Sequence, residues 1–167
     1  DVAICNGSST TLSGTATSVP FAQVLSTIND AAGFNTMTTN DVARWGFSTS
    51  ANAGGTADEL VMQYSSTATV TSYVQSPLLN ASNYTALSMT FKHNLDWFQA
   101  TAPLFMQTSP DGVTWTTRWN VNATTNIAAN TVTVDLSALN NTSFYYRFLY
   151  DGNTFNIDFW YIDDIVV

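Results

Sequence analysis

Short runs in which apolar and polar residues alternate dominate this chain. In Ala86–Phe91, the side chains of Leu87, Met89 and Phe91 fall on one face, and Thr131–Leu136 repeats the pattern. A spacing of two residues places side chains on opposite faces of an extended strand, whereas a helical face repeats every 3.6 residues. The sequence therefore predicts strands that each bury one face against a core.

Turn-forming residues separate these runs at regular intervals. They are Gly54-Gly55, Ser76-Pro77, Pro110-Asp111-Gly112 and Asp151-Gly152-Asn153. Further strands are predicted at Val42–Phe47, Glu59–Tyr64, Thr69–Val74, Leu104–Thr108, Thr114–Trp119, Phe144–Tyr150 and Trp160–Val167. About nine short strands at this spacing predict an all-β fold, an antiparallel β-sandwich with little or no helix.

The first twenty residues differ in composition from the rest, since Asn6–Thr17 is almost entirely small and polar. We expect residues 1–20 to form an extended segment, either a linker or a donated strand, and residues 21–167 to form the sandwich domain. Within Phe21–Asn29 the apolar spacing allows a short helix, but its β-branched residues also allow a strand. The start at Asp1 rather than Met indicates a processed or excised segment.

The charge balance excludes several kinds of partner. The chain has 167 residues with 12 Asp and Glu against 4 Lys and Arg, a net charge of −8, and only 10% of its residues are charged. So few cations exclude nucleic acid and anionic lipid as partners, and no run of about 18 apolar residues predicts membrane insertion. A surface built from hydroxyl and amide groups instead predicts a secreted, extracellular protein.

Two covalent features would matter outside the cell. Cys5 is the sole cysteine, so it is either a small buried apolar residue or the site of an intermolecular disulfide. Glycosylation sequons, which matter if the organism glycosylates secreted proteins, begin at Asn6, Asn80, Asn83, Asn122 and the overlapping Asn140 and Asn141.

Four motifs in the chain resemble, in their order, the motifs of a known group of proteins. They are Ser76-Pro77, the stretch Ser109–Trp115, Val134–Ser137 and Ile162–Ile165. Their order resembles that in secreted bacterial jelly-roll modules of the MAM-like and cleaved-adhesin type, which are related to galactose-binding-like and carbohydrate-binding modules. The resemblance runs from about residue 42 to 167, and it implies a jelly-roll sandwich used for attachment.

Asp163 and Asp164 are adjacent on the last predicted strand, so their side chains should point to opposite faces. A carboxylate that points inward needs a partner, either one of the few cations or a bound Ca²⁺. The resemblance implies that an acid on this strand joins a structural calcium site with an acid near the first strand. Here that acid is Asp30, or alternatively Asp41.

No catalytic arrangement is predicted. His93 is the sole histidine, and we expect it to be hydrogen-bonded at a strand end. Glu59 is the sole glutamate, and we expect it to have a structural role. The chain has no Gly-x-Ser-x-Gly elbow and no phosphate-binding loop, so we expect that it is not an enzyme.

Aromatic side chains provide the candidate binding chemistry. Trp97 and Phe98 lie with Asp96 in a predicted loop, and Asn153 and Asn156 lie in another. Exposed rings stack on sugars while amides and carboxylates bind hydroxyls, although the same rings can simply cap the core. The other tryptophans are assigned to strands and to the core: Trp45, Trp115, Trp119 and Trp160.

Two functions are therefore expected. The first is a non-catalytic, secreted, cell-surface adhesion module that binds a glycan or a surface protein and is stabilised by calcium. The alternative is a structural subunit of an extracellular filament or surface layer, in which the N-terminal strand joins copies of the chain.

Overall fold

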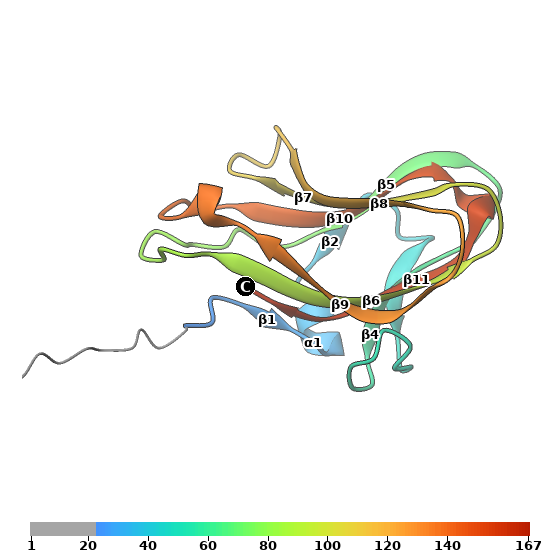
Figure 1. The fold of residues 1–167 in the computed structure, drawn as a ribbon, viewed down its shortest axis with the longest axis horizontal. Helices are drawn as coiled ribbons and strands as arrows, with labels where there is room; N and C mark the ends of the chain where they lie inside the picture. Colours follow the sequence, from blue (N-terminus) through green and yellow to red (C-terminus); the bar gives the residue numbers. More distant parts are fainter. Residues whose placement is uncertain (1–22) are drawn as a thin grey trace, which may run out of the picture.

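Two antiparallel sheets pack face to face in the computed structural model, which describes residues 23–167 (Figure 1). Sheet A has the strand order β3 (Trp45–Ser48), β4 (Glu59–Gln63), β11 (Ile157–Val166), β6 (Ser88–Trp97) and β9 (Ile127–Asp135), and β1 (Thr27–Ile28) also pairs with β11. Sheet B has the order β2 (Thr38–Thr39), β5 (Thr69–Gln75), β10 (Tyr145–Asn153), β7 (Ala102–Ser109) and β8 (Thr116–Ala123).

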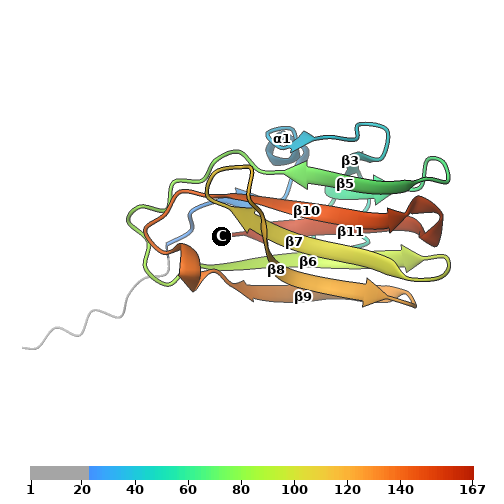
Figure 2. The same ribbon diagram turned by 90° about the horizontal axis from the view of Figure 1, so that it is seen from above.

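The chain passes repeatedly from one sheet to the other, so neighbouring strands are far apart in sequence. The final strand β11, for example, lies between β4 and β6. In the other sheet, β10 lies between β5 and β7 (Figure 2). Within residues 23–167, helix is limited to α1 (Ala31–Phe34) and the 3₁₀ turns η1 (Ser137–Leu139) and η2 (Thr154–Asn156). Eleven strands in two antiparallel sheets confirm the predicted all-β jelly-roll sandwich.

Aromatic rings fill the space between the two sheets. Trp160 of β11 has no exposed surface, and its ring centre lies 5.8 Å from that of Trp45 and 6.1 Å from that of Phe148. Phe91 packs edge to face on Phe148, with 4.9 Å between the ring centres. The alternation seen in the sequence places Leu87, like Phe91, in this core.

Pairing extends two strands beyond their predicted ends. The loop predicted at Asn94–Thr101 begins later than expected, because β6 runs to Trp97 and Asn94 pairs with Tyr161. Asp151-Gly152-Asn153 is not a turn, since these residues belong to β10 and Asp151 pairs with Thr71. For Phe21–Asn29, the sequence allowed either a helix or a strand. The structure has strand β1 in this range, and helix α1 follows it.

Trp115 is not a core residue. The carboxylate of Asp111 accepts hydrogen bonds from the backbone N–H groups of Val113 and Thr114, at 2.8 and 2.7 Å, so the turn continues and β8 begins only at Thr116. Trp115 is consequently half-buried outside the strand. Of the other three tryptophans assigned to the core, Trp119 is half-buried, and Trp45 and Trp160 are buried as predicted.

His93 lies inside β6, between the sheets, rather than at a strand end. It is 2% exposed, its ring packs against Trp119 with 5.1 Å between centres, and its Nδ1 has no hydrogen-bond partner among the described residues. Burial lowers the pKa of His93 to about 4, because the charged imidazolium loses its water. The neutral ring is therefore a core side chain.

The asparagines of the predicted glycosylation sequons differ in their exposure at the surface. Asn80, Asn83 and Asn122 are exposed, whereas Asn140 is half-buried and its Oδ1 accepts hydrogen bonds from two backbone N–H groups. Use of these sequons stays a prediction. Asn6, Cys5 and the segment 1–20 lie outside the described residues. Within 23–167, no helix is long and apolar enough to cross a membrane.

Candidate functional site

Two aromatic rings of β11 point away from the core. Because side chains alternate along the strand, Trp160 and Ile162 face the other sheet, whereas Phe159 and Tyr161 lie on the outer face of sheet A. The rings of Phe159 and Tyr161 are stacked, with 5.5 Å between their centres and 25° between their planes. They form a short aromatic platform on the outside of the sandwich.

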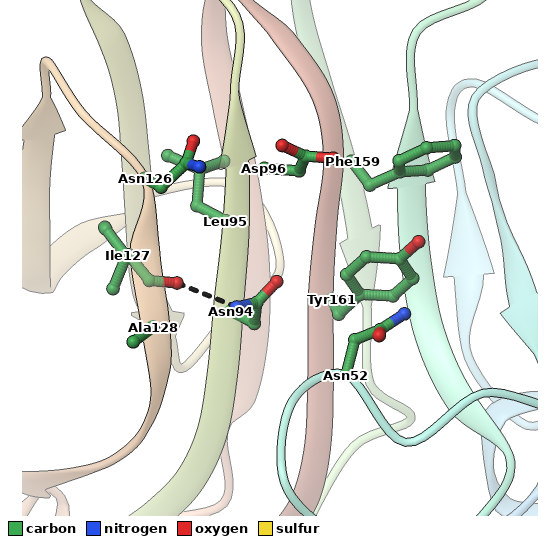
Figure 3. A pocket seen from close by; sticks show the side chains of 9 residues that line it. All are labelled: Asn52, Asn94, Leu95, Asp96, Asn126, Ile127, Ala128, Phe159 and Tyr161. Carbon is green, nitrogen blue, oxygen red and sulfur yellow. Dashed lines mark hydrogen bonds between the residues drawn. The ribbon is translucent and has the colours of Figure 1, made fainter.

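This platform is one wall of a hollow of about 480 Å³ on sheet A (Figure 3). The hollow is lined by side chains from β6, β9, β11 and two loops: Asn52, Asn94, Leu95, Asp96, Asn126, Ile127, Ala128, Phe159 and Tyr161. The rings of β11 face the polar side chains of β6 across the hollow, and Asn52 lies beside Tyr161 (Figure 3).

Hydrogen bonds orient the amides in the hollow. Asn94 donates from Nδ2 to the carbonyl of Ile127 at 2.9 Å, which leaves its Oδ1 for another donor. Asn126 accepts a hydrogen bond from the backbone N–H of Trp97 at 2.8 Å, which leaves its Nδ2 for another acceptor. Together with the exposed carboxylate of Asp96, these groups can bind the hydroxyls of a ligand.

The loop between β3 and β4 forms one rim of the hollow and is held by Glu59. This buried carboxylate accepts hydrogen bonds from the Ser50 hydroxyl at 2.5 Å and from the backbone N–H groups of Asn52 and Ala53 at 2.8 and 2.7 Å. Glu59 therefore fixes Asn52 next to Tyr161, and its role is structural, as predicted.

The electrostatics of the hollow are acidic. No lysine or arginine lines it in the described chain, whereas Asp96 does. Burial, followed by the nearby carboxylate of Glu59, raises the pKa of Tyr161, and Asp96 acts in the same direction. The phenol thus stays neutral and can donate or accept hydrogen bonds.

The residues predicted to bind sugars are only partly brought together. Asp96 lines the hollow, but Trp97 donates its ring N–H to the carbonyl of Ala100 at 2.6 Å. Asn153 caps η2 through the N–H of Phe155, and Asn156 donates to the carbonyl of Thr101 at 2.7 Å. These side chains stabilise the loops at one end of the sandwich.

Phe98 belongs to a separate cluster at that end. It is 50% exposed and packs edge to face on Phe155, which also contacts Tyr64; the ring centres are 5.0 and 5.7 Å apart. The cluster supplies exposed rings, but the amides of Asn153 and Asn156 beside it already have partners in the protein.

Asp163 and Asp164 do not point to opposite faces. Pairing of β11 with β6 is interrupted after Asp163, and Asp164 has a φ of 45°, so the strand bulges there. A Cβ atom built on Gly55 would lie 1.7 Å from Asp163 Oδ2 and 3.2 Å from Asp164 Oδ2, so both carboxylates approach this glycine. The β3–β4 loop, rather than the core, buries Asp163, and only glycine fits at position 55.

The two carboxylates differ in their partners. Asp164 forms an ion pair of 2.8 Å with Lys92, which also donates to the carbonyl of Gly54 at 3.0 Å. Asp163 Oδ1 accepts the N–H of Asp164, but its buried Oδ2 has no partner in the described region. Burial, with the charges of Asp164 and Glu59, raises the pKa of Asp163 to about 6.

Asp30 has a different role from these acids. Its carboxylate accepts a hydrogen bond of 2.7 Å from the N–H of Gly33 and thereby caps α1. Between residues 23 and 167 there is no cluster of three or more His, Cys, Asp or Glu side chains suited to a metal ion. A calcium site here would therefore need backbone carbonyls, such as that of Gly54, beside Asp163 and Asp164.

Solved structures with a similar fold include a bacterial adhesin domain. The K3 cleaved adhesin domain of Lys-gingipain from Porphyromonas gingivalis superposes with a TM-score of 0.64 at 15% identity, over 86% of this chain and 98% of that domain. The chain has the fold of a cleaved adhesin domain. The resemblance expected from the sequence motifs is thus confirmed for the fold.

Carbohydrate-binding modules share this cleaved-adhesin fold. The xylan-binding domain of family 22 has a TM-score of 0.54 at 14% identity, over 88% of this chain and 95% of that one. TmCBM61, solved with β-1,4-galactotriose, has a TM-score of 0.52 at 9% identity, over 78% and 86%. These neighbours are binding modules rather than catalytic domains. No protein-family model and no curated protein sequence matches the chain.

Sequence reasoning missed most of the hollow. Phe159 and Tyr161 lie in a run of four large apolar residues, Phe159–Ile162, which reads as a strand buried on both faces. The acids gave no signal for the outer face, because Asp163 shares the alternation of Tyr161 but Asp158 and Asp164 share that of buried Trp160. Asn94 was missed because β6 was expected to end before it.

Proposed function

We propose that the chain is a non-catalytic adhesion module that binds a neutral glycan in the hollow of sheet A. The observation that carries the proposal is the stacked pair Phe159–Tyr161 inside a hollow lined with amides. Aromatic faces pack against the C–H groups of a sugar ring, and amides bind its hydroxyls. The adhesin and carbohydrate-binding neighbours support this class of function.

The charges of the hollow favour an uncharged ligand. Asp96 lines the hollow, and Glu59 and Asp163 lie beneath the adjoining loop. Uronic acids and sulfated sugars would meet the Asp96 carboxylate in the hollow, which is unfavourable, and the Lys92 ammonium that contacts the same loop is already paired with Asp164. Soluble or matrix glycans outside the cell are neutral ligands of the right chemistry, and we propose that the protein acts there.

Replacing Tyr161 with alanine should weaken binding of a neutral oligosaccharide at least about tenfold, which corresponds to about 1.4 kcal/mol. The variant loses one ring of the stacked pair and the hydroxyl beside Asn52, while the half-exposed position keeps the fold intact. Isothermal titration calorimetry with galactotriose, xylotriose and mannotriose would measure the change.

The control is Phe98→Ala, which removes an aromatic ring, 50% exposed, from the loop cluster instead. Binding of the same oligosaccharides should change less than about twofold. If Phe98→Ala abolishes binding and Tyr161→Ala does not, the ligand occupies the loop end predicted from the sequence. Failure of wild-type protein to bind any glycan on a broad array would contradict the glycan proposal.

We further propose that a calcium ion binds at Asp163 and Asp164 beneath the β3–β4 loop. The buried, unpartnered Oδ2 of Asp163 supports this, because such a carboxylate requires a cation or a proton. Lys92 competes with the ion, since its ammonium already contacts Asp164 and the Gly54 carbonyl. Asp30, which caps α1, is a less suitable ligand.

Removal of calcium with a chelator should lower the melting temperature by several degrees, because an ion that binds only the folded state stabilises it. The same treatment should leave an Asp163→Asn variant unchanged. Equal melting temperatures of the wild type with excess calcium and with chelator would eliminate the metal.

A structural subunit of a filament or surface layer is the second candidate. It is favoured by β9, an edge strand of sheet A that carries no charge from Ile127 to Val134 and whose outer edge pairs with no strand of residues 23–167. Such an edge can accept a strand from another copy. Electron microscopy should then reveal polymers of the full chain that disappear when residues 1–20 are deleted; polymers that survive the deletion would exclude donation by this segment.

A further inference from the structure

Arg147 occupies the centre of the outer face of sheet B, on the side of the sandwich opposite the hollow. It lies on β10, between Gln75 of β5 and Gln107 of β7. The guanidinium carbon lies 4.1 Å from the ring centre of Trp115 and 4.9 Å from that of Tyr73. The Arg147 cradle is this guanidinium together with Trp115, Tyr73, Gln75 and Gln107.

The cradle fixes the orientation of the guanidinium. Arg147 donates from Nε to Oε1 of Gln107 at 2.8 Å, and the two rings hold the guanidinium by cation–π contacts. Nε is the only atom of this group with a hydrogen-bond partner in the described structure. The two terminal amino groups, Nη1 and Nη2, are therefore an oriented fork of free donors.

Arg147 has no carboxylate partner among residues 23–167, although the chain has 12 acids and only 4 Lys and Arg. Arg44 pairs with Asp41 and Lys92 with Asp164. Arg118 forms no ion pair among residues 23–167 either, but its charge helps to lower the pKa of Asp135. Desolvation lowers the pKa of Arg147, so burial against the rings opposes its charge. A cation held without an anion in an acidic protein suggests that the anion comes from a ligand.

We propose that the Arg147 cradle binds the carboxylate of a uronic acid residue in an acidic polysaccharide. The fork of Nη1 and Nη2 matches the two oxygens of one carboxylate. One cation suits a single negative charge better than a sulfated or phosphorylated chain, which would need a basic cluster. The amide of Gln75 lies on one side for a hydroxyl, whereas Gln107 accepts from Arg147 and donates to Thr117 and so serves to hold the fork in place. Half-buried Phe105 offers an apolar surface on the same face.

The open shape of this face favours a polysaccharide over a peptide. Arg147 lies in the middle of a five-stranded sheet, with paired strands on both sides, so an extended chain can run across it in either direction. A peptide carboxyl terminus is usually held by backbone N–H groups as well, and here the N–H groups of β10 are engaged in pairing with β5 and β7. This site is independent of the neutral hollow on sheet A.

The test compares trigalacturonate with galactotriose by isothermal titration calorimetry at about 0.15 M salt, where repulsion from the net charge is screened. Wild-type protein should bind trigalacturonate, and Arg147→Gln should weaken that binding at least about tenfold. Arg147→Lys keeps the charge but loses the planar fork, so it should also weaken binding severalfold. Neither variant should alter binding of galactotriose.

Arg118→Gln is the matched control. It removes the same charge from β8, the edge strand of the same sheet, where the Arg118 Nε donates to Thr108 rather than into the cradle. This variant should bind trigalacturonate within about twofold of wild type, which separates the cradle from the effect of net charge alone.

Three results would overturn the proposal: no binding of trigalacturonate to wild type, equal binding by Arg147→Gln, or an Arg147-dependent ligand that is a peptide carboxyl terminus. Because Arg147→Lys preserves the cation–π contacts, a folded sample is available even if Arg147→Gln unfolds. Loss of galactotriose binding in Tyr161→Ala with trigalacturonate binding retained would show that the two sites are separate.

Discussion

Replacement of Trp160 by alanine should lower the free energy of unfolding by about 3 to 5 kcal/mol. The Trp160 side chain is fully buried between Trp45 and Phe148, one from each sheet. Its removal takes away a large apolar area and leaves a cavity that rigid strands on both sides cannot close. A sandwich of this size has a stability of about 5 to 15 kcal/mol, so the variant should be close to unfolding.

Urea denaturation followed by circular dichroism would measure the loss, and the adjacent Phe159→Ala is the control. Phe159 is on the same strand but 36% exposed on the outer face, so its truncation should cost less than about 1 kcal/mol. Similar losses in the two variants would mean that the assignment of faces along β11 is wrong. The contrast therefore tests the geometry of the binding hollow as well as the core.

The fold could be predicted from the sequence because alternation is a local signal that tertiary packing reinforces. Leu87, Met89 and Phe91 read as one face and lie together in the core. The ends of strands were less predictable, because pairing partners decide them: Asn94 is in β6 since Tyr161 lies opposite it. Trp115 was misplaced because Asp111 prolongs a turn by three hydrogen bonds that spacing does not reveal.

The sites were harder to predict than the fold. Adjacent acids on a regular strand point apart, but the bulge at Asp164 turns both toward Gly55. The hollow depends on Asn52, which a distant glutamate, Glu59, holds in place through hydrogen bonds that cross the loop. The Arg147 cradle could not be predicted from the sequence either, because only the three-dimensional structure shows whether an acid lies near a given cation.

The stability of the wild type should change little between about pH 7 and pH 4 in the presence of chelator, because two buried groups oppose each other. His93 has its pKa lowered from 6.5 to about 4, so its stabilising contribution is complete above 6.5 and is lost as the pH falls toward 4. Asp163 has its pKa raised from 3.8 to about 6, so its contribution is complete below 3.8 and is lost as the pH rises toward 6.

Each of the two pKa changes is equivalent to about 3 kcal/mol, and the two pH windows overlap almost completely. Single substitutions should therefore reveal pH dependences of the unfolding free energy that cancel in the wild type. Asp163→Asn leaves only the His93 contribution, so its unfolding free energy should fall by about 2 to 3 kcal/mol from pH 7 to pH 4. His93→Gln leaves only the Asp163 contribution, so its unfolding free energy should rise by a similar amount.

Chemical denaturation of the three proteins at pH 7, 5.5 and 4 would measure these slopes, with EDTA present so that no metal alters the titration of Asp163. Only the change with pH within each protein matters, because either substitution also alters packing by a constant amount. The double variant should again be nearly flat, since both titrating groups are gone and the remaining shifted carboxyls, Asp111 and Asp135, have lowered pKa values and act mainly below pH 4. If the unfolding free energy changes with pH in the same direction in both single variants, the two groups do not oppose each other and the prediction is wrong. A steep change with pH in the wild type would mean that one of the two side chains is hydrated rather than buried.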